Sequence, residues 1–111
     1  EIAGNYAQAI AAINTIQAQI VDQNGNQAKQ RKMRASSGVC GSGIKWAGLE
    51  MVKKLVKTRD EQQATIDIIG IGGVMEADDY FQYRDAGADA VMSATGAMWN
   101  PYLAQEIKDQ L

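Results

Sequence analysis

The segment from residue 66 to residue 95 constrains the fold of this chain more than any other part. It begins with a short β-rich run, IDIIGIGGV, continues with a helical stretch and ends with a second apolar run, AVMSAT. Gly87 follows the helical stretch, at a point where helices commonly end in a left-handed residue. Strands that alternate with helices predict parallel β-α-β units, because the helix returns the chain to the same end of the sheet.

The first third of the chain predicts a strand followed by a hairpin. Residues 9–16 form a small apolar run of the length typical of a buried parallel strand. Residues 16–22 alternate between apolar and polar types and lead into QNGN at 23–26, where an Asn-Gly pair favours a tight hairpin turn. Residues 27–37 are polar and basic, and they predict an exposed return strand or a loop.

Helices are predicted from apolar spacing and from end signals. Residues 44–57 carry apolar side chains at helical intervals, and residues 75–86 predict a second helix. Four residues share one side of that second helix: Ala77, Tyr80, Phe81 and Arg84. Asn100 suits the N-cap of a last helix, and Pro101 suits its first helical position.

The resulting order is strand, hairpin, helix, strand, helix, strand, helix. A closed (β/α)8 barrel needs about 250 residues, whereas this chain has 111 and begins with Glu rather than Met. We therefore expect an α/β fold equivalent to about three βα units from the C-terminal portion of such a barrel, with a β-hairpin after the first strand. No composition shift divides the chain, so residues 1–111 are expected to belong to one domain.

Glycines after the first run of this segment form the clearest candidate site. Gly72 and Gly73 have no Cβ, so their backbone N–H groups can approach an anion, and the following helix would add its partial positive charge. About twenty residues later, the next strand ends in the small residues Ser93, Ala94 and Thr95. Two adjacent strand ends with such loops match the phosphate site after strands 7 and 8 of many barrels.

A second interpretation is that the glycines only make tight turns between strand and helix, but the paired loops favour phosphate binding. The motif is not the dinucleotide-binding fingerprint, because no G-x-G-x-x-G opens the helix and no acidic residue ends the next strand. It also lacks the Lys-Ser/Thr pair of a P-loop.

Polar groups at strand ends and helix starts offer further candidates. Asn14 and Thr15 end the first strand, where an amide can both donate to and accept from a planar substrate; a local turn that stops the strand is the alternative. Cys40 lies among glycines with no recognisable base, so we expect a small packed residue rather than a nucleophile. Lys45 has two interpretations, an anion contact or a solvated side chain.

Composition excludes several kinds of chemistry. The chain has no histidine, which removes His-based acid/base catalysis and most zinc sites. Glu76, Asp78 and Asp79 stand in the first turn of a helix, where the dipole favours them, so we expect no metal site. A net charge of −2 predicts no nucleic-acid or anionic-membrane binding. The single cysteine and the absence of a long apolar run or signal peptide favour the cytoplasm.

Together these pieces resemble the C-terminal part of the class 1 dihydroorotate dehydrogenases, from about residue 9 to residue 107. The motifs that carry the resemblance are INT at 13–15, SGVCGSGIK at 37–45, IDIIGIGGV at 66–74, AGADAV at 86–91, SAT at 93–95 and NP at 100–101. Several ordered motifs at family-like spacing are more specific than any one of them. Related flavin barrels share the Gly-Gly and Gly-Thr loops, so the substrate is less constrained than the superfamily.

The resemblance implies a barrel that binds FMN at its C-terminal face and oxidises dihydroorotate to orotate in pyrimidine biosynthesis. It places Gly41 near the flavin and implies that Gly72 and Gly73 bind the flavin phosphate through their N–H groups. Ala94 and Thr95 would complete that phosphate site.

The same resemblance assigns the substrate side of the site. Asn14 and Thr15 would correspond to an Asn-Ser/Thr pair that hydrogen-bonds the orotate ring. The family's catalytic base, a Cys or Ser on a loop after an earlier strand, and a lysine that contacts the flavin would both lie upstream of this chain. We therefore expect no catalytic residue here and an inactive fragment, which self-associates or needs the missing part of the barrel.

The sequence also departs from the family pattern. Ala94 stands where the family usually has Gly, so a methyl group crowds the phosphate while the N–H remains available. Cys40, Gly41 and Ser42 replace a Ser-Gly-Pro motif common in one subgroup. Two alternatives therefore stay open: another FMN- or sugar-phosphate-binding barrel enzyme, and a non-enzymatic phosphate-binding half-barrel module.

Overall fold

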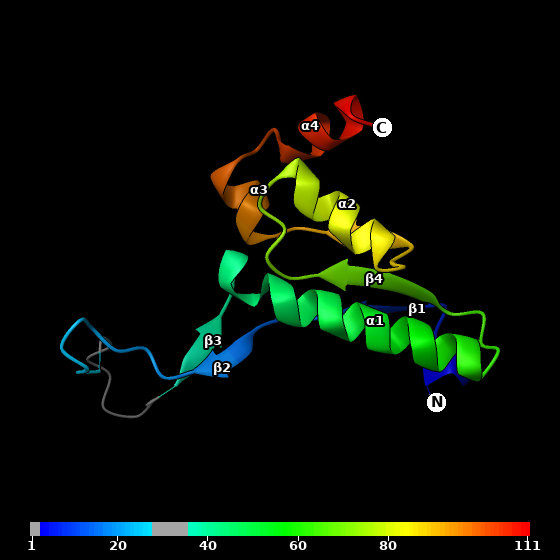
Figure 1. Ribbon diagram of the computed structural model, residues 1–111, viewed down its shortest axis with the longest axis horizontal. Helices are drawn as coiled ribbons and strands as arrows, with labels where there is room; N and C mark the ends of the chain where they lie inside the picture. The colour runs from blue at the N-terminus through cyan, green and yellow to red at the C-terminus, as the bar shows by residue number, and fades with distance from the viewer. Residues whose placement is uncertain (1–2, 28–35) are drawn as a thin grey trace.

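A three-stranded parallel sheet forms the centre of the protein (Figure 1). The computed structural model describes residues 3–27 and 36–111. Its strands are β1 (Ala9–Ala12), β4 (Asp67–Ile71) and β5 (Ala90–Met92), in the spatial order β1-β4-β5. Both pairings are parallel, with Ala11 opposite Ile69 and Ile71 opposite Met92. The expected α/β fold with about three βα units is confirmed.

Helices connect and follow these strands. The elements are the short 3-10 helices η1 (Ala3–Asn5) and η2 (Ser42–Ile44) and the α-helices α1 (Lys45–Glu61), α2 (Ala77–Asp85), α3 (Thr95–Trp99) and α4 (Leu103–Asp109). No helix of the described chain is long and apolar enough to cross a membrane. The sequence did not predict α3, because its five residues carry no apolar period of their own.

The predicted hairpin excursion is present. β2 (Ile16–Ala18) pairs antiparallel with β3 (Ser37–Val39), and Val21 bridges Gln27. Gly25 has a φ of 79°, and the Asp22 carboxylate accepts the N–H groups of Asn24 and Asn26 at 2.8 and 2.9 Å. These bonds hold the turn at the predicted Asn-Gly pair. Most of the predicted return segment at 27–37 lies outside the described residues.

Strand β1 is shorter than expected. The apolar run at 9–16 predicts one strand, but β1 ends at Ala12 and Ile16 already belongs to β2. The run therefore contains a strand, a three-residue corner and the start of the hairpin. Apolar periodicity cannot separate these states, because all three bury side chains.

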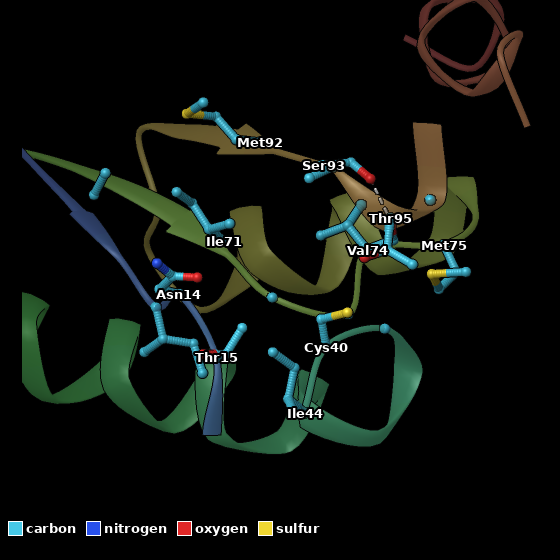
Figure 2. A pocket seen from close by; sticks show the side chains of 17 residues that line it. Asn14, Thr15, Cys40, Ile44, Ile71, Val74, Met75, Met92, Ser93 and Thr95 are labelled. Atoms are coloured by element: carbon cyan, nitrogen blue, oxygen red, sulfur yellow. Dashed lines mark hydrogen bonds between the residues drawn. The ribbon is translucent and has the colours of Figure 1, made fainter. Parts of the chain in front are cut away.

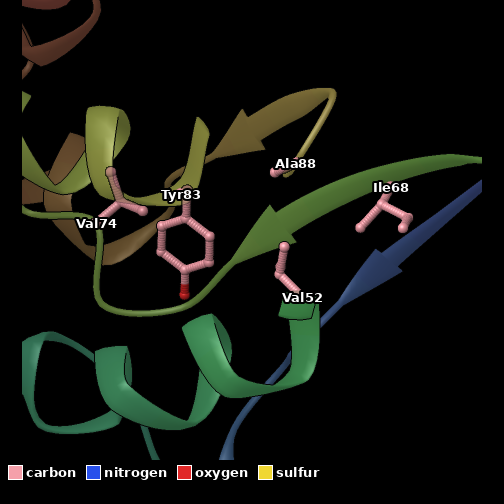
Figure 3. Close-up of a cluster of buried hydrophobic side chains, with 5 residues drawn as sticks. All are labelled: Val52, Ile68, Val74, Tyr83 and Ala88. Atoms are coloured by element: carbon pink, nitrogen blue, oxygen red, sulfur yellow. The ribbon is translucent and has the colours of Figure 1, made fainter. Parts of the chain in front are cut away.

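The two faces of the sheet differ in their cover. Ile68 is 1% exposed and belongs to a core with Val52 of α1 and Tyr83 of α2, so both helices pack on the same face (Figure 3). Side chains alternate along a strand, so Ile69 and Ile71 face the opposite side. Met92, paired with Ile71, is 52% exposed there. Within the described chain, no further strand pairs with the outer edges of β1 and β5.

Tyr83 defines the buried side of α2. It is fully buried, and its hydroxyl donates to the Gly72 carbonyl at 2.6 Å. Of the four residues that the sequence places on one side of this helix, Ala77 is buried, Tyr80 and Phe81 are half-buried and Arg84 is exposed. Tyr83 is not one of these four residues, and its ring fills the space between α2, α1 and β4.

Glycines make room for that ring. A Cβ on Gly48 of α1 would lie 1.8 Å from the Tyr83 hydroxyl oxygen, and a Cβ on Gly70 of β4 would lie 2.3 Å from the Tyr83 ring. Neither glycine has a positive φ. They are needed for the close approach of α1, β4 and α2, and the packing of this core depends on their missing methyl groups.

The signals at helix ends are confirmed at one helix and corrected at another. After α2, Gly87 has a φ of 103°, its N–H donates to Arg84 O, and Ala88 N–H donates to Tyr83 O, which is a Schellman ending. Asn100 does cap a turn, since its side-chain oxygen accepts the Tyr102 N–H at 3.1 Å. However, α4 begins two residues later than predicted, at Leu103.

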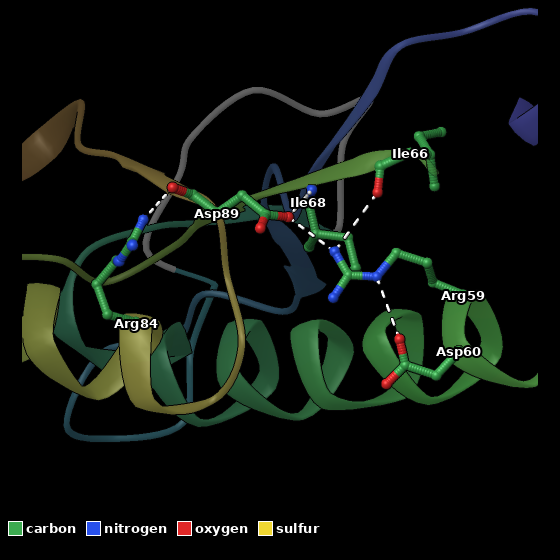
Figure 4. A network of polar contacts seen from close by, with 6 residues as sticks. All are labelled: Arg59, Asp60, Ile66, Ile68, Arg84 and Asp89. Atoms are coloured by element: carbon green, nitrogen blue, oxygen red, sulfur yellow. Dashed lines mark hydrogen bonds and ion pairs between the residues drawn. The ribbon is translucent and has the colours of Figure 1, made fainter. Parts of the chain in front are cut away.

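A polar cluster closes the amino end of β4 (Figure 4). The Asp89 carboxylate accepts the Ile68 N–H and the Arg59 guanidinium, both at 2.8 Å, and Arg84 donates to the Asp89 carbonyl. The Ile68 N–H and the nearby Arg59 charge hold the pKa of Asp89 below its usual value, although burial opposes them. The cluster ties α1 and α2 to the strand at the end opposite Gly72, so it stabilises the sheet away from the glycine loop.

Replacing Gly48 with alanine should destabilise the protein although it lies in a helix. Alanine ordinarily stabilises a helix interior by about 0.5–1 kcal/mol relative to glycine. Here the new methyl group would overlap the Tyr83 hydroxyl, and overpacking of this kind costs about 1–3 kcal/mol. We expect urea unfolding of Gly48→Ala to show a net loss of about 1 kcal/mol, the overpacking cost less the gain in helix stability.

Gly43→Ala is the matched control, because a Cβ there would meet nothing within 4 Å. It should change the free energy of unfolding by less than about 0.5 kcal/mol. Equal stability of the two variants would contradict the packing described for Tyr83.

Candidate functional site

A cavity of about 410 Å³ lies at the carboxyl ends of the three parallel strands (Figure 2). The loops after β1, β4 and β5 and the turn before α1 line it. All seven predicted binding residues lie on its wall: Asn14, Thr15, Gly41, Gly72, Gly73, Ala94 and Thr95. They come from four segments that are far apart in the sequence, so the fold brings the predicted cofactor and substrate residues to one place.

The glycine loop follows β4 directly. Gly72 has a φ of 126° and Gly73 a φ of 69°, values that residues with a side chain rarely adopt. A Cβ on Gly73 would also lie 2.7 Å from the Lys45 Cβ, so the loop packs tightly on the start of α1. Neither N–H group of this glycine pair donates a hydrogen bond to another described residue. Both glycines line the cavity, so their N–H groups are candidate donors to a ligand there.

The second loop, after β5, is tied to the first. The Ser93 hydroxyl donates to the Val74 carbonyl at 2.7 Å, and a Cβ on Gly96 would lie 2.1 Å from that same carbonyl oxygen. Ala94 and Thr95 are held beside the glycine loop, and α3 begins at Thr95. The loops after β4 and β5 are adjacent, as the sequence predicted. The short helix α3 that follows the second loop was not predicted.

The start of α2 does not supply free donors, contrary to the expectation that this helix end would attract the anion. Glu76 and Asp79 form a capping box: the Glu76 side chain accepts the Asp79 N–H, and the Asp79 side chain accepts the Glu76 N–H. Asp79 also accepts the Met75 N–H at 2.9 Å. Carboxylates of α2 itself thus occupy these N–H groups, which leaves the anion to the glycine loop and the loop after β5.

Lys45 contacts an anion, as one of its two interpretations had it, but this anion is a side chain of the protein itself. The Lys45 ammonium lies 2.5 Å from the Asp79 carboxylate, which is 3% exposed. Burial alone would raise the pKa of Asp79, but hydrogen bonds from Lys45 and from the Met75 and Glu76 N–H groups lower it below its usual value. The ion pair joins the start of α1 to the start of α2 beneath the glycine loop, so Lys45 supports the loop.

The predicted substrate residues stand at the end of β1. Asn14 and Thr15 are both exposed and line the cavity. Among the described residues, the Asn14 side chain makes no hydrogen bond, so the local turn considered as its alternative is not formed. Its amide remains able to donate and accept. A Cβ on Gly38 of β3 would lie 2.6 Å from the Thr15 hydroxyl oxygen, so the hairpin limits the position of Thr15.

Cys40 and Gly41 close the cavity from the side of α1. Cys40 is exposed on the cavity wall, so the prediction of a small packed residue is wrong. Gly41 has a φ of 81° and faces the Thr95 side chain across the cavity, since a Cβ there would be 3.8 Å from the Thr95 methyl. The sequence also missed the apolar walls: Ile13, Ile44, Ile71, Met75 and Met92. These residues could have been found from the sequence, because they lie close to the polar or glycine residues at the strand ends.

A parallel sheet with helices on one face and a glycine-lined cavity at its strand ends has the arrangement of a sector of a (β/α)8 barrel enzyme. The family model for dihydroorotate dehydrogenase matches residues 2–111. The chain belongs to the dihydroorotate dehydrogenase family. The family generally uses a flavin, and its members are oxidoreductases.

Individual relatives support this assignment. The chain is 35% identical over 98 residues to dihydroorotate dehydrogenase of Dictyostelium discoideum, covering 88% of this chain and 26% of the relative. It is 35% identical over 106 residues to the catalytic subunit of dihydroorotate dehydrogenase B (NAD(+)) of Staphylococcus carnosus, covering 96% and 32%. The chain thus spans about a quarter to a third of the length of these relatives.

A solved structure gives the same fold. The crystal structure of the Eimeria tenella dihydroorotate dehydrogenase in complex with ferulenol superposes with a TM-score of 0.67 at 22% identity. The match covers 92% of this chain and 25% of the other. This agreement supports the expected partial barrel.

Replacing Asp79 with asparagine should weaken the protein at neutral pH and remove part of its acid sensitivity. The pKa of Asp79 in the folded state lies below its unfolded value of 3.8. Its stabilisation is therefore complete above that unfolded value and is lost as the pH falls through the lower folded value. We expect Asp79→Asn to lose about 2 kcal/mol at pH 7, because Lys45 keeps a half-buried charge without its partner.

The same variant should lose less stability than the wild type when the pH is lowered from 5 to 3. Urea unfolding at several pH values measures both effects. The exposed neighbour Asp78 provides the control, and Asp78→Asn should follow the wild-type curve. If Asp79→Asn also followed that curve, the Lys45–Asp79 pair would have no part in stabilising the loop.

Proposed function

We propose that the chain forms the FMN-binding sector of a dihydroorotate dehydrogenase that oxidises dihydroorotate to orotate in pyrimidine biosynthesis. One observation carries the proposal. A single cavity holds free backbone donors on Gly72 and Gly73 at one side and the unbonded amide of Asn14 at another. An anion site and a site for a planar polar ring are thus joined in one pocket, as a flavin phosphate and a pyrimidine substrate require.

The residues present fit FMN. The left-handed glycines let the loop pack tightly on Lys45, and a Cβ on Gly72 would crowd the cavity wall at Ile13 (3.1 Å) and Ile44 (3.5 Å). Gly72, Gly73, Ala94 and Thr95 would hold the phosphate, mainly through backbone N–H groups, with the Thr95 hydroxyl as a further donor. Gly41 would lie beside the flavin ring. FMN, when bound, would supply the acceptor for the hydride removed from the substrate.

The apolar walls of the cavity have a separate part in this proposal. Ile44, Ile71 and Met92 offer no hydrogen bonds, and they would exclude water from the ring of the flavin. Exclusion of water strengthens the polar contacts that remain in the pocket. The specificity then depends on the few polar groups at the strand ends.

Asn14 and Thr15 would orient the substrate. A carboxamide can accept from a ring N–H and donate to a ring carbonyl at once, and dihydroorotate presents both groups. Neither residue can remove a proton from substrate carbon at neutral pH. We place the catalytic base, as the family resemblance implies, in a part of the parent enzyme outside this chain.

The open face of the sheet completes the proposal. Ile69, Ile71 and Met92 stand on the face that neither α1 nor α2 covers, and Met92 is largely exposed. The remaining strands of a barrel, or a second copy of the chain, would cover this face and pair with the free edges of β1 and β5. The free thiol of Cys40 suits a protein that works in the reducing cytoplasm.

Binding of FMN and riboflavin tests the cofactor assignment, because the two flavins differ only in the phosphate. We expect the chain to bind FMN more tightly than riboflavin in a fluorescence titration. Thr95→Ala should weaken FMN binding by about tenfold, since it removes one hydrogen bond to a charged group. The same substitution should change the affinity for riboflavin very little.

Thr58→Ala, at an exposed position on α1, serves as the control and should leave both affinities unchanged. Equal affinity of the wild-type chain for the two flavins would exclude phosphate recognition here. Phosphate-ion binding without any flavin binding would favour the non-enzymatic module.

The chain alone should not reduce a dye with dihydroorotate as electron donor, because it offers no candidate base. The assay is dichlorophenolindophenol reduction with saturating FMN, followed at 600 nm. A relative of full length is the positive control. Turnover above the rate of free FMN would mean that a residue of this chain, and foremost the exposed Cys40, acts as the base.

A further inference from the structure

Tyr83 reaches from the second turn of α2 to the loop that follows β4. Figure 3 shows its ring between α2 and α1, with the hydroxyl directed away from α2. The hydroxyl donates to the Gly72 carbonyl at 2.6 Å, and no part of the side chain is exposed. Gly48 and Gly70 leave room for the ring on two sides. The ring therefore has little freedom to move, and its hydroxyl has one fixed position.

The acceptor of this hydrogen bond belongs to the same peptide unit as a proposed anion donor. The Gly72 carbonyl and the Gly73 N–H lie in one planar trans peptide, so they point in opposite directions. Tyr83 holds the carbonyl toward the buried core between α1 and α2. The Gly73 N–H must then point away from that core, and both glycines line the cavity on the other side.

Without this bond, the orientation of the peptide would be weakly determined. Two glycines flank it, and glycine adopts positive and negative φ with similar ease. A rotation of the peptide plane would exchange the directions of the Gly72 carbonyl and the Gly73 N–H. It would present a carbonyl oxygen to an anion and leave the N–H in the core. A fixed donor on the buried side prevents this exchange, because the Tyr83 hydroxyl needs an acceptor.

We infer that Tyr83 is a positioning residue for anion binding: it orients the Gly72–Gly73 peptide so that the Gly73 N–H faces the cavity, and it thereby sets the preference for a phosphorylated flavin over an unphosphorylated one. The inference rests on the proposed function for the identity of the anion. Its structural part, the orientation of one peptide, stands on the hydrogen bond alone.

The surroundings of Tyr83 keep its hydroxyl a donor at every physiological pH. Burial, together with the nearby Asp79 carboxylate, raises the pKa of Tyr83 to about 12. The charged group that acts on Tyr83 is Asp79 of α2, and this carboxylate is paired with Lys45 of α1. The orientation of the peptide should therefore not change between pH 5 and pH 9.

Tyr83→Phe tests the inference because it keeps the ring and removes the hydroxyl. We expect FMN affinity to fall by about tenfold, the value of one hydrogen bond to a charged acceptor, while riboflavin affinity changes by less than twofold. Tyr80→Phe, on the same helix but half-buried, is the control and should leave the FMN-to-riboflavin ratio unchanged. A general loss of structure would weaken the binding of both flavins equally. The ratio of FMN affinity to riboflavin affinity therefore separates a positioning role from a role in folding.

The second readout does not need a flavin. In 15N-labelled wild-type chain, the Gly73 amide resonance should shift on titration with inorganic pyrophosphate, and this shift should be lost in Tyr83→Phe but kept in Tyr80→Phe. If wild-type chain binds neither flavin while the Gly73 amide still responds to pyrophosphate in a Tyr83-dependent way, the cofactor proposal fails and the positioning role holds. An unchanged flavin ratio together with an unchanged Gly73 response in Tyr83→Phe would overturn the inference.

Discussion

The hydrogen bond from Tyr83 to the Gly72 carbonyl links the core of the protein to its cavity. It requires α1, β4 and α2 to approach one ring, which is possible because Gly48 and Gly70 lack a Cβ. The same bond ends at the loop where the anion donors stand. The packing of the helices on the sheet and the geometry of the loop after β4 therefore depend on each other. A change that moves the Tyr83 ring also moves this loop.

Two further contacts stabilise the loop after β4. The Lys45–Asp79 pair joins the starts of α1 and α2, and the Ser93 hydroxyl joins the loops after β4 and β5. The Asp79 carboxylate also accepts hydrogen bonds from the Met75 and Glu76 N–H groups at the start of α2. These internal bonds leave the backbone donors of Gly72 and Gly73 without a partner in the described chain. Preorganised free donors beside satisfied ones are what an anion site needs.

The sequence predicted more of the site than of its support. Every predicted binding residue lines the cavity, because carboxyl ends of neighbouring parallel strands must meet at one edge of a sheet. The partner of Lys45 was not predictable, because Asp79 lies 34 residues away in the sequence. The exposure of Cys40 was not predictable either, because it depends on tertiary packing. The short helix α3 and the apolar walls were missed for a related reason: neither has a periodic signal of its own.

What the sequence by itself determined is the order of strands and helices, the hairpin at Asn24 and Gly25, and the helix ending at Gly87. These features follow from local backbone preference and from apolar spacing, which are properties of a few neighbouring residues. Only the tertiary structure decided which side of α2 is buried and which N–H groups remain free. Those outcomes depend on the space between α1, β4 and α2, and that space exists only when distant segments pack together.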